Sequence, residues 1–420
     1  MADAVTRGMM DTAIYRGRDF NYFLSSRFLA TAAMQVQSVA IGWQIYDIER
    51  TPFALGMVGL CQFAPMFLLT LPAGEISDRF DQRRVLAFAL MVLGICSGLF
   101  LLLSLVEPRN ALLFYAVLVL FGAARGFAGP SSQSLLAFLV PPERLAKSIA
   151  LSSSAFTIAV IAGPALGGIL FATGPIATYS FCVAGFLLSG LLAMTLGGRM
   201  LDRSRSGAAT RWERVVEGIR FVRERPIVLG AISLDLFAVL LGGAVALLPV
   251  FARDILHVGP IGLGALRSAP AAGAALTAFS LSRWPIMRRS GTRMFAAVAV
   301  FGLATIAFGL SRNFYLSLAA LIVVGASDMI SVNVRQSLIN FATPDPMRGR
   351  VGAVSMLFIG ASNELGEFES GITAAWFGTI PAVIVGGIGT LAVVAAWMKM
   401  FPRLRNVDKL TDVAPDAQRS

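Results

Sequence analysis

The chain has 420 residues, of which 56 % are hydrophobic and only 14 % are charged, and its mean hydropathy is +0.73. A soluble protein of this length cannot hide so much apolar surface from water, which excludes a soluble globular domain. The net charge of +11 does not indicate a nucleic-acid partner, because the basic residues are distributed as in a membrane protein.

Apolar segments long enough to cross a membrane recur along the whole chain. A hydrocarbon core of ~30 Å takes about 20 residues to span. About twelve segments meet this length and are bounded by Pro, Gly and charges, and they predict an all-α integral membrane protein. We place them at 20–46, 54–73, 84–105, 112–140, 146–172, 176–196, 226–250, 260–282, 294–311, 314–341, 351–378 and 381–401.

Lysine and arginine gather on one side of these predicted spans. Of the 35 Lys and Arg residues, 27 fall in the tails and in the loops on the side of the amino terminus. The opposite side holds only Arg50, Arg109, Arg253 and Arg312. The positive-inside rule therefore predicts that both termini are cytoplasmic, and we expect a bacterial inner membrane. The first apolar run has no obvious cleavage site and is expected to remain as the first helix.

The stretch 122–169 recurs in register 203 residues later, with 12 identities in 48 ungapped positions. A parallel repeat over about half the chain is typical of secondary transporters, whose substrate site lies between the copies. At two of the mismatched positions the two copies carry residues of different charge or chemical type. Arg125 in the first copy corresponds to Asp328 in the second, and Pro164 corresponds to Glu367.

The repeat and the charge pattern predict two bundles of six helices. A basic linker between them contains apolar residues at helical spacing, which indicates an amphipathic helix lying on the anionic cytoplasmic leaflet. A merely solvated linker helix is the alternative, and the chain after Pro402 is expected to be disordered. The predicted divisions are a cytoplasmic segment at 1–19, bundles at 20–196 and 226–402, the linker at 197–225 and a tail at 403–420.

Nine charged residues fall inside predicted spans, where each charge costs ~2.5–3.5 kcal/mol at the membrane centre, so they should face a cavity or a partner. Asp235 lies close to the midplane, whereas Arg335 lies near the cytoplasmic end and is expected to extend towards that interface. A static buried ion pair, such as Asp235 with Arg125, is the structural alternative. The nine are Arg27, Arg125, Arg267, Arg335, Asp235, Asp328, Glu364, Glu367 and Glu369.

Carboxylates that can become neutral suit a proton-coupled carrier. Asp235 is the first candidate for the proton carrier, followed by Asp328 and Glu367, with Glu364 one helical turn from Glu367. Arg125 is the first candidate to contact substrate or act as a counter-ion. Further candidates for that role are Arg27, Gln35, Gln133, Asn333 and Arg335.

Two segments suit gating. The first has a proline within a glycine-rich span, which permits a kink and close helix packing; its residues are Gly163, Pro164, Gly167 and Gly168. The second is a loop of acids and arginines that could form a charged latch; its residues are Gly74, Asp78, Arg79, Arg83 and Arg84. All three cysteines fall inside spans and there is one histidine, so neither disulfides, a metal site nor another cofactor is expected.

Twelve spans in two parallel halves, the basic central loop and the Gly74-to-Arg84 loop resemble the major facilitator superfamily. Asp81 departs from the common loop pattern, which has Gly there. This variant, with the segments Gln35–Ser38 and Ser362–Glu367, resembles the branch that contains the enterobactin exporter and macrolide efflux proteins. The resemblance implies that helices 1, 4, 7 and 10 line the cavity, bringing Arg27, Arg125, Asp235 and Asp328 to it. It also implies that Asp78 meets the start of the eleventh span near Val351.

These observations predict a secondary active transporter that works by rocker-switch alternating access. We expect a monomer that exports a small organic molecule, such as a siderophore or an amphiphilic drug, against inward proton flow. An importer or uniporter on the same fold is the alternative, and a non-transporting receptor or scaffold is a third class. An enzyme is not expected, because the sequence has no nucleophile–base pair and no phosphate-binding loop.

Overall fold

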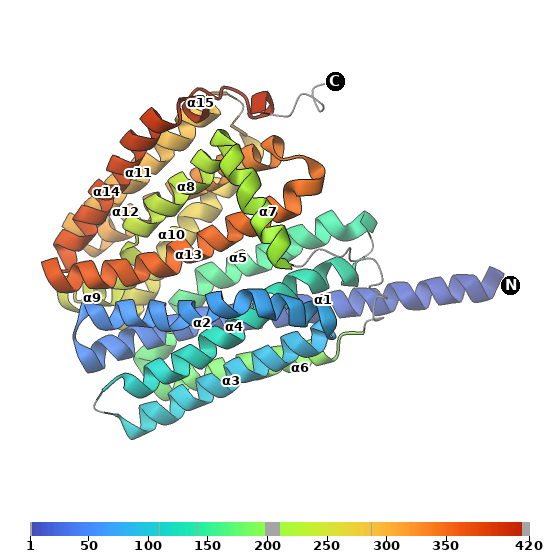
Figure 1. The fold of residues 1–420 in the computed structure, drawn as a ribbon. Helices are drawn as coiled ribbons and strands as arrows, with labels where there is room; N and C mark the ends of the chain where they lie inside the picture. The colour runs from blue at the N-terminus through green and yellow to red at the C-terminus, as the bar shows by residue number, and fades with distance from the viewer. Residues whose placement is uncertain (1, 109, 141, 198–210, 287, 414–420) are drawn as a thin grey trace. The chain divides into compact units, whose positions relative to one another are not determined.

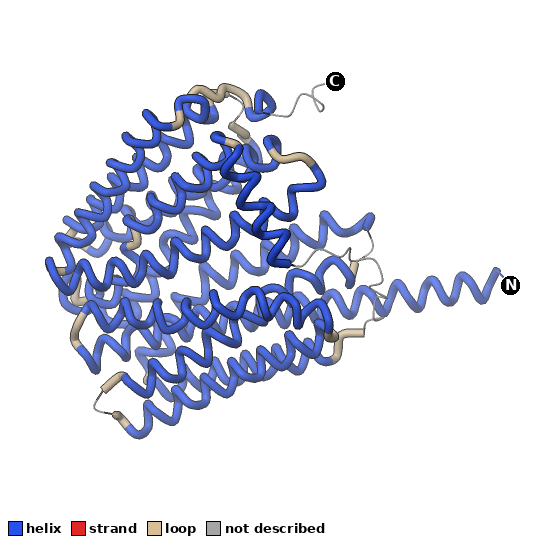
Figure 2. Tube along the Cα trace, in the orientation of Figure 1, coloured by secondary structure: helices blue, strands red, loops and turns tan. Residues whose placement is uncertain are grey.

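The computed structural model describes residues 2–108, 110–140, 142–197, 211–286 and 288–413. Every regular element in these ranges is helical, and short connections join consecutive helices (Figure 2). Contacts divide the chain into two compact units. The first comprises Met1–Ile41 and Ala64–Gly207, and the second comprises Gly42–Phe63 and Ala208–Ser420. Residues 42–63, which the sequence places in the first bundle, are therefore grouped with the second unit by their contacts.

Six helices supply the first unit, and α3 lies beside α4 and α6 (Figure 1). Their bounds are α1 Ala2–Glu49, α2 Pro52–Arg79, α3 Gln82–Val106, α4 Leu112–Leu139, α5 Pro142–Thr173 and α6 Pro175–Met194. The end of α1 and the first half of α2, within Gly42–Phe63, belong to the second unit. A buried aromatic group joins three of these helices, since the Phe100 ring centroid lies 5.8 Å from those of both Phe114 and Tyr179.

The second unit contains the remaining elements. Its long helices are α7 Arg211–Glu224, α8 Pro226–Leu241, α10 Gly259–Arg283, α11 Ser290–Leu310, α12 Phe314–Ala342, α13 Asp345–Phe377 and α14 Thr379–Met400. Shorter elements are η1 Ala244–Leu247, α9 Leu248–Val250, η2 Phe251–Ile255, α15 Pro402–Arg405 and η3 Leu410–Val413. In its core, Ala231 and Leu234 of α8 pack with Phe295 of α11 and Val334 of α12.

The twelve predicted spans correspond to twelve long helical segments among the described residues, so the all-α membrane fold is confirmed. Nine of the described segments are apolar enough in composition alone to cross a membrane. Helices α1, α10 and α13 are the three outside that group. Each of the three carries charged residues within its predicted span, among them Arg27, Arg267 and Glu367. Charge alone does not separate the two groups, because α4, α8 and α12 carry Arg125, Asp235 and Asp328 and belong to the nine.

The internal repeat is preserved in the helix boundaries. Helix α4 ends at Leu139 and α12 ends at Ala342, which is 203 residues later, since 342 − 139 = 203. Helix α5 begins at Pro142 and α13 begins at Asp345, again 203 residues later, since 345 − 142 = 203. The weak sequence repeat therefore corresponds to one helical hairpin built twice.

The seventh span is broken, which the sequence did not predict. Helix α8 ends at Leu241, and Gly242 and Gly243 lead into the 3₁₀ turn η1 before the chain turns helical again. Two backbone carbonyls beside the break accept hydrogen bonds from hydroxyl groups. Ser370 Oγ donates to the Gly243 carbonyl at 2.8 Å, and Thr390 Oγ1 donates to the Ala238 carbonyl at 3.0 Å. Such partners allow a helix to be interrupted at membrane depth.

The predicted linker helix is present as α7, and it packs on the second unit. Val222 is buried in a cluster with Val351 and Val354 of α13. Gly218 of α7 lies so close to α13 that an added Cβ would be 2.9 Å from the Arg350 carbonyl oxygen. Val216 remains exposed. One part of α7 thus contacts protein and another remains open, while residues 198–210 of the predicted linker lie outside the described residues.

The expectation that the chain after Pro402 is disordered is wrong for residues 402–413. Leu404 is fully buried, and the irregular segment that follows it accepts hydrogen bonds from the start of α11. Gly291 N–H donates to the Val407 carbonyl at 3.0 Å, and Arg289 N–H donates to Asp408 Oδ1 at 2.9 Å. The tail therefore supplies hydrogen-bond acceptors that the first turn of α11 lacks.

Candidate functional site

A buried ion pair joins α8 to α12 inside the second unit. Asp235 Oδ1 contacts Arg335 Nη1, and the two side chains are only 9 % and 3 % exposed. The expectation that Arg335 extends to the cytoplasmic interface is wrong, because its guanidinium turns inward to this carboxylate. The sequence named Arg125 as an example of a partner for Asp235; the structure gives that role to Arg335. Removing either charge would leave the other buried and unpaired.

Asp328 lies on α12, seven residues before Arg335. Seven residues are two helical turns, so the two side chains project from the same face, about 10 Å apart along the axis. The Asp328 side chain is half-buried, and no described side chain forms a hydrogen bond or an ion pair with it. Helix α12 thus carries an uncompensated carboxylate and a paired guanidinium on one face.

A second group of charges joins α10, α13 and the amino-terminal half of α2. Arg267 of α10 lies in the electrostatic field of Glu367 and Glu364 of α13. Gly59 of α2 faces Glu367, since a Cβ added there would lie 3.1 Å from Glu367 Cβ. One turn earlier, an added Cβ at Gly56 would be 3.0 Å from the Phe368 carbonyl oxygen. Glycine at both positions therefore lets α2 approach the acidic face of α13.

The sequence did not reveal a third cluster, formed at the end of α1 and the end of the broken span. Tyr46 donates a hydrogen bond to Asp254, and Arg253 Nη1 lies 2.5 Å from Asp47 Oδ1. The Arg253 guanidinium also lies 5.4 Å from the centre of the Trp43 ring. No local sequence pattern indicated these contacts, because the residues that form them are far apart in the sequence. The charge count had placed Arg253 in a loop on the side opposite the termini.

In the first unit the candidate substrate contacts lie on two helices, α1 and α4. The Arg27 guanidinium lies 5.6 Å from the Phe156 ring centre, which joins α1 to α5. Arg125 of α4 is half-buried and is engaged in a contact of its own. Gln133, further along α4, is exposed. Asn333, the remaining amide candidate, is half-buried on α12 of the second unit.

The glycine-rich segment of α5 packs directly on α1. A Cβ added at Gly163 would lie 2.6 Å from Gln35 Cβ, and one at Gly167 would lie 3.0 Å from Val36 Cα. Gly168 and Pro164 are buried beside them, and α5 continues past Pro164 to Thr173. The structure therefore brings Gln35 against the predicted kink helix, and the glycines serve close helix contact.

Asp81, the residue at which the predicted gating loop departs from the common pattern, has a structural role. Its carboxylate caps α3 by accepting from the Arg83 N–H at 3.0 Å, and it holds the Arg83 guanidinium through contacts of 3.0 and 2.7 Å. These hydrogen bonds from Arg83 lower the pKa of the Asp81 carboxyl below its usual value. Gly74 is buried and Arg84 is exposed. The side chains of Asp78 and Arg79 lie outside the described ones, so their predicted contact near Val351 remains a prediction.

Helical bundles with buried charges and a repeated hairpin define a class of protein, the secondary transporters of the major facilitator superfamily. A family model described as a transmembrane secretion effector matches residues 12–418. The chain belongs to this family, which is a family of transporters and not of enzymes.

Two curated relatives resemble nearly the whole chain. The enterobactin exporter EntS of Citrobacter koseri is 24 % identical over 390 residues, which cover 92 % of each chain. A Na⁺, Li⁺, K⁺/H⁺ antiporter of Planococcus maritimus is 23 % identical over 422 residues, covering 91 % of this chain and 96 % of the relative. The chain is therefore similar both to an exporter and to a cation/proton antiporter.

Solved structures with the same fold are also transporters. A bacterial homologue of the human lysosomal transporter Spinster, inward-facing and occupied, has a TM-score of 0.72 and 14 % identity over 93 % of this chain and 97 % of its own. The nucleoside transporter NupG has a TM-score of 0.70 and 14 % identity over 91 % and 99 %. At such low identity these structures show the fold alone.

Proposed function

We propose that this protein is a proton-coupled exporter of a small organic molecule that works by rocker-switch alternating access. It acts as a monomer in the bacterial inner membrane, with both termini cytoplasmic and the proton gradient as its energy source. A siderophore or an amphiphilic drug is the expected class of substrate. The observation that carries the proposal is the uncompensated carboxylate of Asp328 beside the Asp235–Arg335 pair.

Asp328 is the proposed proton carrier. An ionised carboxylate in the membrane core costs ~2.5–3.5 kcal/mol, and a bound proton removes that charge. Asp235 already has a cation, so its charge is balanced without a proton. This difference places Asp328 ahead of Asp235, which the sequence alone had ranked first, and ahead of Glu364 and Glu367, which lie near Arg267.

Arg335 can link the two carboxylates. It shares a helix face with Asp328, and side chains on a helix lean towards its amino terminus, which is the direction of Asp328. When Asp328 is protonated, Arg335 serves Asp235 alone, which is the arrangement observed. When Asp328 loses its proton, one guanidinium faces two carboxylates. Proton release would therefore loosen the α8–α12 contact next to the break at Gly242.

The first unit supplies the proposed substrate contacts. Arg27 and Arg125 present guanidinium groups, which bind carboxylates or catecholates through paired hydrogen bonds. Gln35 and Gln133 add neutral polar groups, and Gly163 and Gly167 hold α5 against α1. Arg125 and Asp328 occupy equivalent positions of the repeat. We propose that the first unit contacts the anionic substrate and that the second unit binds and releases the proton. The exposed face of α7 is proposed to rest on the anionic cytoplasmic leaflet.

Transport against a proton gradient can be measured in inverted membrane vesicles. After the gradient is established, enterobactin, ethidium or an alkali-metal chloride is added while a pH-sensitive dye reports the proton efflux. We expect the addition of enterobactin or ethidium to cause proton efflux from the vesicles. A protonophore should abolish the accumulation of the added compound. Asp328→Asn should abolish both signals. Asp345→Asn, an exposed carboxylate paired with Arg348, is the matched control and should behave as the unmodified protein.

Three results would decide against parts of the proposal. Accumulation that is indifferent to the protonophore would favour an importer or uniporter on this fold. Proton release by sodium, lithium or potassium alone would favour cation/proton antiport, as in the Planococcus relative. Full coupling in Asp328→Asn would remove Asp328 from the proton pathway.

A further inference from the structure

A crevice of about 910 Å³ opens between the end of α2, the start of α3 and the middle of α4, within the first unit. This volume is in the range of sites that hold organic ligands, about 300–1,000 Å³. Every residue that lines it lies between Ile76 and Phe127. The described lining of the crevice therefore belongs to the first unit, and it shares only Arg83 and Arg84 with the predicted gating loop.

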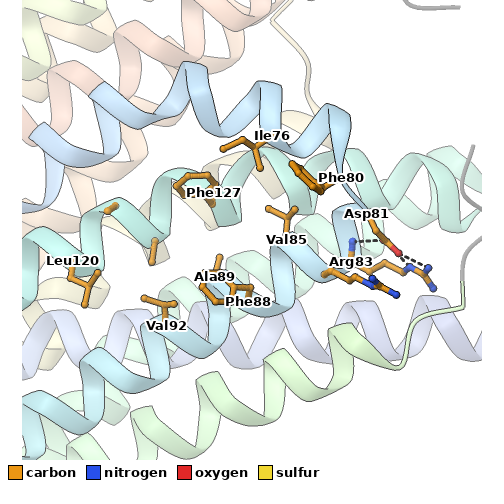
Figure 3. A pocket seen from close by; sticks show the side chains of 13 residues that line it. Ile76, Phe80, Asp81, Arg83, Val85, Phe88, Ala89, Val92, Leu120 and Phe127 are labelled. Atoms are coloured by element: carbon orange, nitrogen blue, oxygen red, sulfur yellow. Dashed lines mark hydrogen bonds and ion pairs between the residues drawn. The ribbon is translucent and has the colours of Figure 1, made fainter. Parts of the chain in front are cut away.

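The walls of this α2–α3–α4 crevice are apolar, because each helix contributes one face. Helix α4 contributes Leu120, Ala123, Ala124 and Phe127 at helical spacing, and Figure 3 shows Phe127 opposite the α3 wall. The small side chains of the two alanines leave the space that forms the crevice. Ala124 is almost fully buried at its floor, whereas Leu120 is 44 % exposed at its rim.

The α3 wall repeats this pattern, with larger side chains standing at the opening. Val85, Phe88, Ala89 and Val92 follow the same helical spacing. Phe88 is 71 % exposed, and Phe80 at the end of α2 is 65 % exposed. Large exposed aromatic side chains that flank a hollow floor are suited to hold a flexible hydrocarbon chain.

Polar groups lie at one end of the crevice. In Figure 3, Asp81 and Arg83 stand at one end of the row of side chains, and Leu120 and Val92 stand at the other. Asp81 and Arg83 neutralise one another. Arg84, which also lines the crevice, is exposed and lies in the electrostatic field of Asp81 without forming an ion pair with a described side chain. Among the described residues that line the polar end, two guanidinium groups therefore face one carboxylate.

We infer that the α2–α3–α4 crevice binds one anionic phospholipid, with its phosphate at Arg84 and an acyl chain between Phe88 and Phe127. The charge at one end and the apolar walls along ~12 Å of α3 match a lipid headgroup and chain. A water-soluble organic anion would have to place polar groups against the long apolar floor, where they would find no hydrogen-bond partners. Basic pockets beside membrane helices on the cytoplasmic side are suited to anionic headgroups.

Lipid binding can be measured by native mass spectrometry of the delipidated full-length protein. Phosphatidylglycerol and phosphatidylcholine with the same acyl chains are added in equal amounts, and glycerol phosphate is tested separately. We expect phosphatidylglycerol to be preferred. Arg84→Gln should reduce that preference about five-fold, as one lost basic contact implies, while Arg84→Lys should keep most of it. Ala123→Leu should lower the occupancy by both lipids, because it fills the floor.

Arg144→Gln is the matched control. Arg144 is the third residue of α5, as Arg84 is the third residue of α3, and it is exposed but does not line the crevice. It should leave the preference unchanged. Equal binding of both lipids, an unchanged preference in Arg84→Gln, or glycerol phosphate binding as well as the lipid would each overturn the inference. Because Arg84→Gln is a surface change, it keeps the test decisive even if Ala123→Leu fails to fold.

Discussion

The α4–α5 hairpin and the α12–α13 hairpin are one structural unit built twice, yet they meet different neighbours. In the first unit, Gly163 and Gly167 press against α1, which continues without a break. In the second, Gly366 occupies the position of Gly163 and presses against the end of α8, where an added Cβ would lie 3.1 Å from the Leu240 carbonyl oxygen. Ser370 occupies the position of Gly167 and donates to the carbonyl of Gly243.

This difference separates two roles that the same hairpin can have. Where both small residues are glycine, the neighbouring helix is continuous and the contact is a simple close packing. Where the second is serine, the neighbouring helix is interrupted and its freed carbonyl is satisfied. Buried charge follows the same division, because Asp328 and Arg335 replace Arg125 and Ser132. Polar chemistry and backbone irregularity are therefore concentrated in the second hairpin.

The largest expected effect comes from the buried charge that only the second hairpin carries. Arg335→Leu leaves Asp235 buried without its cation and should destabilise the protein by about 3–5 kcal/mol. Ser132→Ala, at the equivalent position of the first hairpin, should change the stability little. Thermal unfolding in detergent measures both. The double variant Asp235→Asn/Arg335→Leu should recover most of the loss; equal stability of Arg335→Leu and the unmodified protein would show that the pair contributes nothing.

A smaller effect is expected at the serine that accompanies the helix break. Ser370→Ala removes the donor to the Gly243 carbonyl and should cost about 1–3 kcal/mol, with faster amide exchange in residues 241–247. Ser362→Ala, on the same helix, is the control, because Ser362 donates only to a carbonyl of its own helix. Unchanged exchange around Gly243 in Ser370→Ala would mean that the break does not depend on this hydrogen bond.

The smallest effect concerns the first unit and depends on pH. Asp81→Asn keeps an N-cap on α3 but removes the charge that holds Arg83, and we expect a loss of about 0.5 kcal/mol at pH 7. Because Arg83 lowers the pKa of Asp81, this contribution is present above the ordinary carboxylate value and is lost as the pH falls through the lowered one. The difference in melting temperature between the two proteins should therefore persist down to the ordinary carboxylate value, about pH 4, and shrink only at lower pH. A difference that grows on acidification would contradict this assignment.

The number and order of the membrane helices could be predicted from the sequence, because apolar runs of sufficient length have few alternatives in a bilayer. The repeat predicted that the two hairpins are equivalent, and Leu139 and Ala342 do end equivalent helices, but the predicted spans missed the observed helix bounds by up to six residues, as at Asp345. The break at Gly242 and Gly243 was missed, because two glycines in an apolar span equally suit close packing. The hydrogen bonds that Ser370 and Thr390 donate beside the interruption depend on the tertiary structure, which no local pattern encodes.

The candidate site was predictable as a set of residues but not as a set of contacts. Insertion costs identify Asp235, Asp328 and Arg335 as residues that need an explanation. Which carboxylate takes the guanidinium depends on how α8 and α12 are rotated, and no local pattern encodes that rotation. The pairing of Tyr46 with Asp254 had no local signal at all, because the two residues are 208 positions apart.

The docked carboxyl-terminal segment affects how the sidedness of this protein should be measured. Reporter domains fused to successively truncated chains are a common means of locating a terminus. A fusion made at Phe401 would remove the acceptors that Val407 and Asp408 offer to the start of α11. The signal of such a reporter would come from a protein in which the start of α11 has lost hydrogen-bond acceptors. A fusion placed after Ser420 keeps those acceptors and reports on the intact one.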